Sequence, residues 1–155
     1  MTRVLVTGGQ GQLGRCIQDV SKAYSDIEFF FRDSKSLDIS NFLMVDTILK
    51  KESFDYCINC AAYTNVQEAE KNPDKANALN GAAVRNLATL CKETNTILIH
   101  ISTDYVFDGE KEEAYTIQDH PNPINAYGKS KLLGERYIQD IMSDYFIIRT
   151  TRFFK

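Results

Sequence analysis

The sequence has no uninterrupted apolar run approaching the roughly 20 residues that a membrane-spanning helix needs. It also has no excess of basic residues, because 18 lysines and arginines stand against 21 aspartates and glutamates. A nucleic-acid-binding face, in which basic and aromatic side chains are interleaved, is therefore not expected. The N-terminus runs at once into a strand-like segment without the layout of a signal peptide. We expect a cytoplasmic protein whose partners include neither a membrane nor a nucleic acid.

Residues that bind metals or form disulfides are also scarce. Cys57 and Cys60 match the C-x-x-C spacing of some zinc and redox sites. However, residues 54–62 are predicted to form a buried strand, on which side chains three positions apart point to opposite faces. No second pair has the spacing of zinc ligands, so we predict no metal site and interpret the cysteines as buried thiols. His100 and His120 are interpreted as structural residues, on a strand and on a loop.

Short apolar runs alternate with amphipathic helices along the chain, without a repeat or a linker. Strands are expected at residues 4–7, 27–32, 56–59, 96–102 and 145–149. Helices are expected around the apolar stripes Leu13/Ile17/Val20 and Phe42/Val45/Leu49, from Asn72-Pro73 through Ala76, Leu79, Ala83, Leu87 and Leu90, and over about 125–141. Strands that alternate with helices need crossover connections. The pattern predicts an α/β fold over residues 1–155, a Rossmann-like doubly wound parallel sheet with helices on both faces.

A glycine-rich segment lies between the first strand and the first helix. Gly8, Gly11 and Gly14 permit a tight turn, close approach of a ligand to the backbone and close packing of the helix. The helix then presents free amides and the positive end of its dipole to a pyrophosphate. The glycine pattern in this position predicts a dinucleotide-binding loop.

The end of the second strand is expected to select the cofactor. A basic side chain there suits the 2′-phosphate of NADPH, whereas an acidic one suits the ribose hydroxyls of NADH. Arg32 favours NADPH, but Asp33 follows immediately, so NADH stays open.

Tyr127 and Lys131 are four residues apart in the last predicted helix and so share a face. An ammonium beside a phenol favours the phenolate, so we expect Lys131 to lower the pKa of Tyr127. A phenol tuned in this way can act as a general acid or base. The one long loop, residues 108–123, is expected beside this site, since loops after strand ends line the crevice of an open α/β sheet.

Five motifs occur in order: TGGQGQLG at 7–14, LDI at 37–39, NCAAYT at 59–64, STDYVFDG at 102–109 and YGKSK at 127–131. Together they resemble the dTDP-4-dehydrorhamnose reductase family within the extended short-chain dehydrogenase/reductase superfamily. The resemblance implies an NAD(P)H-dependent enzyme that reduces the 4-keto group of a nucleotide sugar. It implies that Tyr127 protonates the keto oxygen, that Thr103 holds this oxygen, and that Lys131 tunes Tyr127 and binds the nicotinamide ribose.

The same resemblance assigns the binding residues. Those implied for the cofactor are Gly8, Gly11, Gln12, Leu13 and Gly14 at the phosphates, Asp38 and Ile39 near the adenine, and Ala61, Ala62 and Tyr63 along the third strand, with Tyr127 and Lys131. Thr103, Asp104 and Tyr105 are implied to face the sugar. Members of the family often form homodimers, sometimes around a magnesium ion, although the sequence contains no ligand cluster for one.

Alternatives remain open at the level of sequence. Tyr105 stands where related dehydratases carry a second acid, so elimination is disfavoured. An epimerase of the same superfamily, or a non-catalytic dinucleotide-binding module like the regulatory subunit of methionine adenosyltransferase, remains an alternative. The resembling reductases place a tryptophan near the position of Arg152, which puts the identity of the sugar in doubt. They also continue beyond the length of this chain, so we expect residues 1–155 to form the cofactor-binding part without the C-terminal substrate-binding part.

Overall fold

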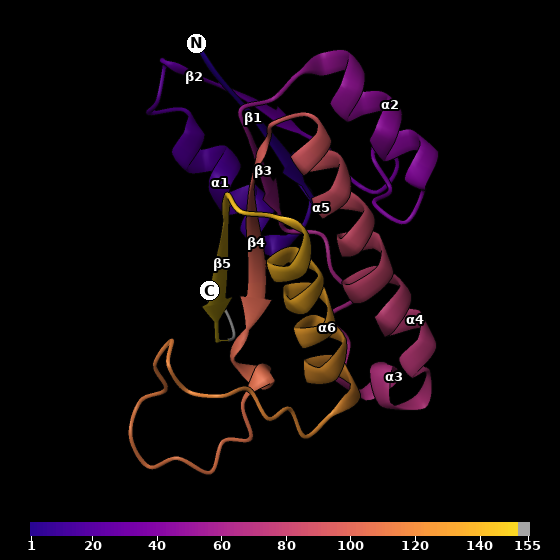
Figure 1. Cartoon of the computed structure of the whole chain (residues 1–155). Helices are drawn as coiled ribbons and strands as arrows, with labels where there is room; N and C mark the ends of the chain where they lie inside the picture. The colour runs from indigo at the N-terminus through magenta and orange to yellow at the C-terminus, as the bar shows by residue number, and fades with distance from the viewer. Residues whose placement is uncertain (152–155) are drawn as a thin grey trace.

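The computed structural model of the protein describes residues 1–151 (Figure 1). Its strands are β1 (Thr2–Thr7), β2 (Ile27–Phe31), β3 (Tyr56–Asn59), β4 (Ile97–Thr103) and β5 (Tyr145–Thr150). Its helices are α1 (Gln12–Ser21), α2 (Phe42–Glu52), α3 (Val66–Lys71), α4 (Pro73–Asn77), α5 (Ala83–Glu93) and α6 (Ala126–Ile141), with a π-helix η1 (Ala78–Ala82) and a 3-10 helix η2 (Asp104–Val106). Arg152 lies outside the described residues.

The five strands form one parallel sheet in the order β2-β1-β3-β4-β5. Helix α1 lies on one face, whereas α2, α5 and α6 lie on the other (Figure 1). This arrangement confirms the predicted doubly wound α/β fold. The register ends β3 at Asn59, opposite His100, so β4 continues past it through residues 101–103. The end of β4 therefore projects beyond its neighbour at the edge where ligands bind in open α/β sheets.

Three of the helices that begin near this edge have an asparagine as N-cap. Asn41, Asn65 and Asn125 each accept a hydrogen bond from a backbone amide in the first turn, which satisfies a donor that the helix leaves free. Asn125 therefore sets the start of α6 at Ala126, two residues before Gly128. Its bond with the Gly128 amide is 2.7 Å long.

One predicted helix is interrupted. The stripe from Ala76 to Leu90 was expected on a single helix beginning at Asn72-Pro73, but the structure has α4, the π-helix η1 and then α5. The preceding helix α3 was not predicted. Apolar periodicity does not reveal the extra residue that a π-helix inserts, and such insertions often occur at functional sites.

The hydrophobic core lies between the sheet and the α2/α5/α6 layer. Leu5, Leu98 and Leu87 are fully buried there. Two residues of the predicted stripes are instead exposed, Val20 to 59% and Phe42 to 50%, because their helices turn these positions outward.

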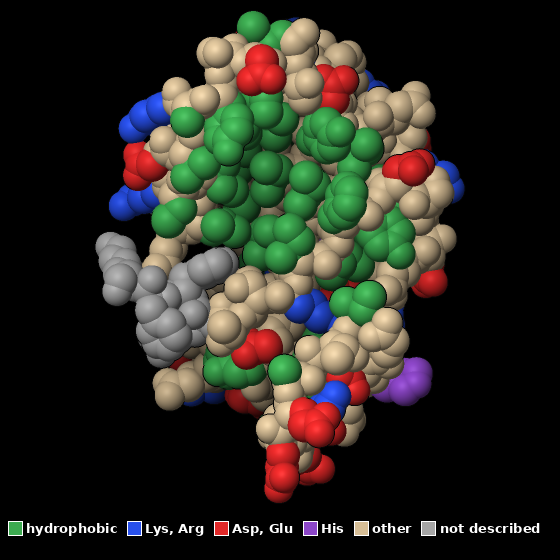
Figure 2. All heavy atoms as spheres, turned by 90° about the vertical axis from the view of Figure 1, so that its left-hand side faces the viewer, with side chains coloured by type: hydrophobic (Ala, Val, Ile, Leu, Met, Phe, Trp, Pro, Cys, Tyr) green, Lys and Arg blue, Asp and Glu red, His purple; other side chains and the backbone are tan. Residues whose placement is uncertain are grey.

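The opposite face of the sheet is apolar but less covered. On β5, Phe146 is 59% and Ile148 is 48% exposed, whereas Ile147 between them packs against the core. Figure 2, which views the molecule from the α1 side, shows hydrophobic side chains gathered on this face. Within residues 1–151, no helix is both long and apolar enough to cross a membrane.

A chain of buried polar side chains crosses the middle of the sheet. The Thr7 hydroxyl donates to Asn59 Oδ1 over 2.6 Å, and Asn59 Nδ2 lies 3.1 Å from His100 Nδ1. Burial and the nearby Lys131 ammonium hold the pKa of His100 well below its ordinary value, so this ring is neutral and accepts the bond. His100 thus has the predicted structural role, and His120 is exposed on its loop.

Candidate active site

A cavity of about 1100 Å³ opens at the carboxyl ends of the strands. Its lining comes from the glycine loop, the loop after β2, the residues after β3, Leu79 of η1, the end of β4, the start of α6 and the end of β5. Segments far apart in the sequence meet here because all five strands run in the same direction. Its size is that of a site for a large ligand.

The glycine loop leaves room for a ligand at the N-terminus of α1. Gly8 has a φ of +64°, and a Cβ there would lie 2.8 Å from the Ala61 nitrogen. A Cβ at Gly14 would lie 2.5 Å from the Gly8 carbonyl oxygen. Gly11 caps α1 without a side-chain hydrogen bond, so the first amides of this 10-residue helix keep their donors for a ligand. Gly8, Gly11, Gln12, Leu13 and Gly14 all line the cavity, as the sequence predicts. These features fit the pyrophosphate of a dinucleotide.

The loop after β2 lines the cavity without Arg32. The guanidinium of Arg32 pairs with Glu52 at the end of α2, with Nη2 and Oε1 3.1 Å apart, and Arg32 is not among the lining residues. Lys35 lines the cavity instead and is exposed. The sequence placed the basic group at the strand end, and could not reveal that Glu52, 20 residues later, would bind it.

Acidic side chains on this loop are held by neighbouring backbone. The Asp33 carboxylate accepts hydrogen bonds from Ser36 and from the Lys35 amide, and the Ser36 bonds lower the pKa of Asp33. Asp38 binds the hydroxyl of Ser40, over 2.7 Å. Asp38 and Ile39 both line the cavity, as the resemblance implies.

After β3, Ala61 and Ala62 line the cavity but Tyr63 does not. The Tyr63 amide donates to Asn80 Oδ1 over 2.8 Å, and the Lys75 ammonium lies 5.5 Å from the centre of the Tyr63 ring. The implied role of Tyr63 at the cofactor is therefore not supported by its position. Thr64, the last residue of the NCAAYT motif, lines the cavity in its place, together with residues 65–67, which the sequence did not single out.

Thr103, Tyr127 and Lys131 line the cavity together, on the wall formed by β4 and α6. Thr103 is the last residue of β4, and its hydroxyl oxygen accepts the Tyr105 amide over 3.2 Å, which caps η2. The rings of Tyr105 and Tyr127 meet edge to face with centroids 5.7 Å apart. Asp104 and Tyr105 also line this wall and are exposed toward the cavity side of the protein.

The contact made by Lys131 and the pKa of Tyr127 both differ from what helix spacing predicted. Lys131 is 2% exposed, and its Nζ donates to the Ile101 carbonyl over 2.7 Å rather than to the phenol. Burial raises the pKa of Tyr127, with smaller contributions from Asp104 and Tyr105, while a hydrogen bond with Thr103 acts the other way. The expected lowering of this pKa by Lys131 is therefore wrong. Tyr127 keeps its proton at neutral pH and can donate it.

Lys131, and not Tyr127, is the residue of this wall whose pKa is shifted toward neutral pH. Burial lowers the pKa of Lys131 to about 8, although Glu135 and Cys60 both raise it. Burial disfavours the charged form of a cation, and the two neighbours offset part of that cost. Lys131 is therefore mostly charged at neutral pH and loses its charge in mildly alkaline solution.

Buried polar residues behind this wall were missed by the sequence reasoning. Asn80, on the π-helix η1, donates to the Tyr63 carbonyl and to the Ser130 hydroxyl, each over 2.9 Å. Ser130 in turn donates to the Tyr127 carbonyl over 2.7 Å. Asn80 thus joins the segment after β3 to the first turn of α6. The only sequence signal was an asparagine at a position of the helix stripe that faces the core.

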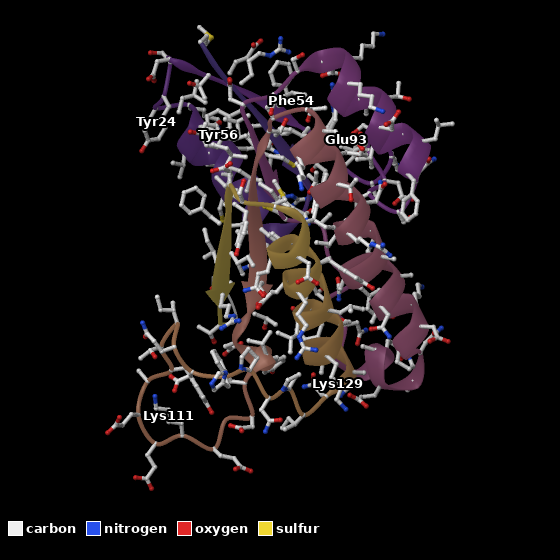
Figure 3. All side chains as sticks on the ribbon, in the orientation of Figure 1. Tyr24, Phe54, Tyr56, Glu93, Lys111 and Lys129 are labelled. Atoms are coloured by element: carbon white, nitrogen blue, oxygen red, sulfur yellow. The ribbon has the colours of Figure 1, made fainter. Side chains whose placement is uncertain are left out.

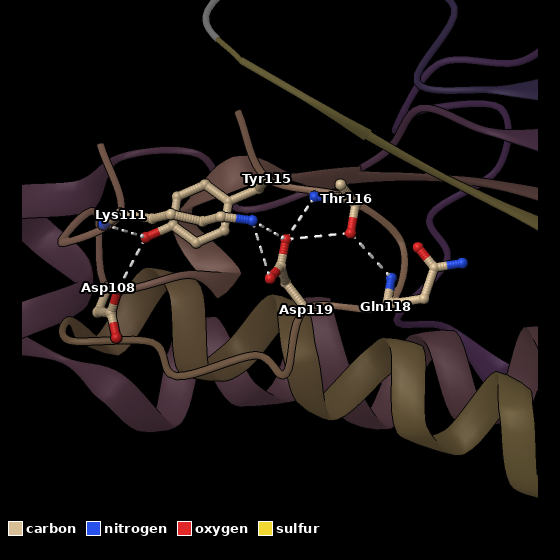
Figure 4. A network of polar contacts seen from close by, with 6 residues as sticks. All are labelled: Asp108, Lys111, Tyr115, Thr116, Gln118 and Asp119. Carbon is tan, nitrogen blue, oxygen red and sulfur yellow. Dashed lines mark hydrogen bonds and ion pairs between the residues drawn. The ribbon is translucent and has the colours of Figure 1, made fainter. Parts of the chain in front are cut away.

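The long loop after η2 is ordered by its own contacts (Figure 4). The Tyr115 hydroxyl donates to Asp108 over 2.8 Å, and Lys111 Nζ lies 2.9 Å from Asp119. The Tyr115 ring stacks on Phe107 with centroids 4.2 Å apart. Figure 3 shows Lys111 on this loop, away from the sheet. No residue between Tyr105 and Tyr127 lines the cavity, so the loop borders the site without forming its wall.

The described residues contain no group of three or more His, Cys, Asp or Glu side chains that could hold a metal ion. All four cysteines are free. Cys57 is buried on β3, where a hydrogen bond with Cys91 raises the pKa of its thiol well above the ordinary value. A magnesium ion at a dimer interface stays a prediction from the resemblance.

The sequence and the fold were compared with those of known proteins. The family described as the RmlD substrate binding domain matches residues 1–155. A probable low-salt glycan biosynthesis reductase of Haloferax volcanii is 40% identical over 93% of the chain, and a dTDP-4-dehydrorhamnose reductase of Aggregatibacter actinomycetemcomitans is 38% identical over 97%. A crystal structure of dTDP-4-dehydrorhamnose reductase from Bacillus anthracis in complex with NADP superposes with a TM-score of 0.94 at 39% identity, over 97% of this chain and 54% of that one. The chain covers 51% of each of the two curated relatives and so spans about half their length.

Proposed function

The chain belongs to the RmlD substrate binding domain family, and from this membership we propose that it carries the cofactor-binding and catalytic residues of an NADPH-dependent reductase. The substrate is a nucleotide-linked 4-keto-deoxysugar, dTDP-4-dehydrorhamnose, which is reduced to dTDP-L-rhamnose. The observation that carries the proposal is that Thr103, Tyr127 and Lys131 share one cavity with the glycine loop. Relatives named as reductases, at 38% and 40% identity, support it.

Tyr127 is the proton donor of the reaction. Its raised pKa keeps the phenol protonated, so it can give a proton to the keto oxygen as negative charge develops there. Thr103 donates a hydrogen bond to the same oxygen from the end of β4. NADPH, when bound, supplies the hydride to the sugar carbon.

Lys131 supplies positive charge beneath the reacting oxygen. Its ammonium is held by the Ile101 carbonyl and is charged below a pH of about 8. A buried cation favours the developing negative charge more strongly than an exposed one, because the surrounding dielectric is low. Lys131 also binds the nicotinamide ribose with the donors that Ile101 leaves free.

The remaining assignments divide the cavity between cofactor and substrate. Gly8, Gly11, Gln12, Leu13 and Gly14 bind the phosphates, Asp38 and Ile39 the adenosine, and Ala61 and Ala62 the middle of the cofactor. Asp104 and Tyr105 contact the sugar, which reaches the cavity from the side of β4. Residues 1–155 form the dinucleotide-binding part of the protein, and most of the sugar-nucleotide pocket comes from elsewhere in the polypeptide.

Lys35 selects NADPH over NADH in place of Arg32. The Arg32 guanidinium is engaged by Glu52, whereas Lys35 lines the cavity in the loop that follows the strand. An ammonium there attracts the 2′-phosphate that only NADPH carries. The presence of NADP in the Bacillus anthracis relative supports this choice of cofactor. A homodimer and a cytoplasmic location remain predictions.

The test is to mix the protein with NADPH and each member of a panel of nucleotide 4-keto sugars, and to follow both oxidation of the cofactor and the sugar product. The proposal predicts oxidation with dTDP-4-dehydrorhamnose and formation of dTDP-rhamnose. Interconversion of sugars without net consumption of NADPH would identify an epimerase. Tight binding of NADPH without any sugar product would identify a non-catalytic binding module.

A further inference from the structure

A buried carboxylate lies directly behind the catalytic wall. Glu135 is on α6 and is 0% exposed, and it forms an ion pair with Arg149. Its Oε1 accepts the Ser102 hydroxyl over 2.5 Å and the Arg149 Nε over 3.0 Å, and its Oε2 accepts the Arg149 Nη2 over 2.6 Å. Oε1 is thus bonded to residues of both β4 and β5, and Oε2 to the Arg149 guanidinium on β5.

These bonds tie together three elements that contribute to the active site. Glu135 belongs to α6, Ser102 to β4 and Arg149 to β5. Ser102 immediately precedes Thr103, and Arg149 immediately precedes Thr150, which also lines the cavity. The Glu135 side chain on α6 therefore holds the last residues of both β4 and β5, at the edge where β3 has already ended.

Lys131 makes the matching contact one turn earlier on the helix. Lys131 and Glu135 are four residues apart and share the face of α6 that meets the sheet. Lys131 binds the carbonyl of Ile101, while Glu135 binds the side chain of Ser102. Two consecutive residues of β4 are thus held by two consecutive turns of α6, and the next strand residue is Thr103.

We propose that Glu135 is a positioning residue of the active site, whose carboxylate fixes the end of β4 against α6 and so sets the geometry of Thr103, Tyr127 and Lys131. The effect of Glu135 on catalysis rests on the proposed function, whereas its effect on the position of β4 and on Lys131 does not. Glu135 contacts neither substrate nor cofactor, since it does not line the cavity.

Glu135 also stabilises the charge on Lys131. The groups that face this ammonium are Glu135 on the same helix, Cys60 after β3 and the neutral His100 on β4. Arg149 also pairs with Glu135 and offsets part of the carboxylate's charge. The pKa of Lys131 is lowered by burial and raised by Glu135, so removal of the carboxylate lowers it further, below about 8.

The principal test compares Glu135→Gln with Asp140→Asn, which removes a carboxylate from an exposed position of the same helix. The pKa of Lys131 is read from the ¹³C shift of its ε-methylene during a pH titration, and kcat and KM are measured across the same range. Glu135→Gln is expected to lower the pKa of Lys131 by about one unit, which is a tenfold increase in its acid dissociation constant. We expect kcat to fall roughly tenfold and the KM for NADPH to change less, because Glu135 does not contact the cofactor and acts on it only through Lys131.

A second variant keeps the test decisive if Glu135→Gln fails to fold because Arg149 loses its partner. Ser102→Ala removes the bond to β4 and leaves both charges in place, so it is expected to lower kcat several-fold with the pKa of Lys131 unchanged. A folded Glu135→Gln protein with the wild-type pKa and kcat would overturn the proposal, as would a Ser102→Ala protein with full kcat.

The outcomes separate this proposal from the proposed function. A shift of the Lys131 titration in Glu135→Gln, but not in Asp140→Asn, supports the positioning role even in a protein that reduces no sugar nucleotide. Conversely, reduction of the sugar together with unchanged titration and turnover would leave the function in place and refute the role of Glu135.

Discussion

The two walls of the cavity are built on different principles. The wall formed by β4 and α6 contains Lys131, which is almost fully buried and bonded to the Ile101 carbonyl. Behind this wall lies the fully buried Glu135, which Ser102 and Arg149 hold by hydrogen bonds. The wall formed by the glycine loop and the loop after β2 has exposed residues, such as Gly11 and Lys35, and its donors are backbone amides.

This difference follows from what each wall has to do. A proton donor must keep its proton and hold a fixed position, and burial supplies both: it raises the pKa of Tyr127 and packs its surroundings. A pyrophosphate needs several hydrogen-bond donors and an open approach, which a helix N-terminus without side-chain caps provides. Removal of a functional group from the β4/α6 wall is thus expected to cause a large loss of turnover. On the other wall, NADPH binding should respond mainly to side chains that crowd the backbone of the loop.

The largest effect is expected from Tyr127→Phe, which removes the proton donor and keeps the ring. We expect kcat to fall by about 10²–10⁴, the usual contribution of a general acid, with the Kd for NADPH nearly unchanged. Tyr137→Phe is the matched control, because Tyr137 lies on the same helix outside the cavity and packs against Arg85. Turnover and NADPH titrations of both variants check this. Full turnover in Tyr127→Phe would show that the buried wall does not carry the chemistry.

Gly14→Ala is expected to disrupt the wall formed by the glycine loop. The new Cβ would lie 2.5 Å from the Gly8 carbonyl oxygen, so the loop or α1 has to move. We expect a loss of stability of roughly 1–3 kcal/mol, as for overpacking elsewhere, and an NADPH Kd raised at least about tenfold, since each factor of ten is 1.4 kcal/mol.

Gly11→Ala is the comparison for this change, because its Cβ would meet the same oxygen at 3.1 Å. It should have a smaller effect on unfolding by denaturant and on NADPH binding. Equal effects of the two substitutions would mean that the close contact at Gly14 does not shape the loop.

The pH dependence should report the charged lysine of the buried wall. Lys131 has a pKa of about 8, below the ordinary value of 10.5, so its ammonium is present below that pH and lost above it. We therefore expect kcat/KM to fall as the pH rises through about 8, by up to about tenfold per unit. The raised pKa of Tyr127 cannot produce this limb.

Substitution of lysines on α6 assigns that limb. Lys131→Met should abolish the decline at alkaline pH along with most activity, whereas Lys129→Met should retain it, because Lys129 lies on the exposed side of the helix (Figure 3). A profile that stays flat up to pH 10 in the wild-type protein would contradict the charged role of Lys131.

The smallest effect is expected from the cofactor-selecting residue on the open wall. Lys35→Ala should raise the Kd for NADPH about fivefold and leave that for NADH unchanged, since an exposed ion pair contributes at most about 1 kcal/mol. Arg32→Ala should leave the ratio of the two affinities unchanged, because Glu52 holds this guanidinium. A wild-type preference for NADH would refute the selection of NADPH by either residue.

Much of this architecture could be predicted from the sequence, because local patterns determine it. Alternating apolar runs predicted the parallel sheet, and the glycine spacing predicted the loop at the start of α1. Helical spacing placed Tyr127 and Lys131 on one face of α6. Each of these inferences depends on residues that are near one another in the chain.

What the sequence could not predict depends on residues far apart in the chain. The Arg32 guanidinium pairs with Glu52, the Tyr63 amide donates to Asn80, and Glu135 binds groups from two strands. The direction of the Tyr127 pKa was also wrong, because spacing on the helix predicted a neighbouring charge but not the burial that outweighs it. Burial and long-range pairing become visible only in the folded chain.

The most direct test of the central claim is to follow hydride transfer with an isotope. The protein is supplied with NADPH that carries deuterium at C4 of the nicotinamide, in the transferred position, and with dTDP-4-dehydrorhamnose; the product is then analysed by mass spectrometry and NMR. The account predicts dTDP-rhamnose with deuterium at C4 of the sugar, at a rate that falls by orders of magnitude in Tyr127→Phe and not in Tyr137→Phe. Saturating NADPH binding with no deuterium in the sugar would contradict it.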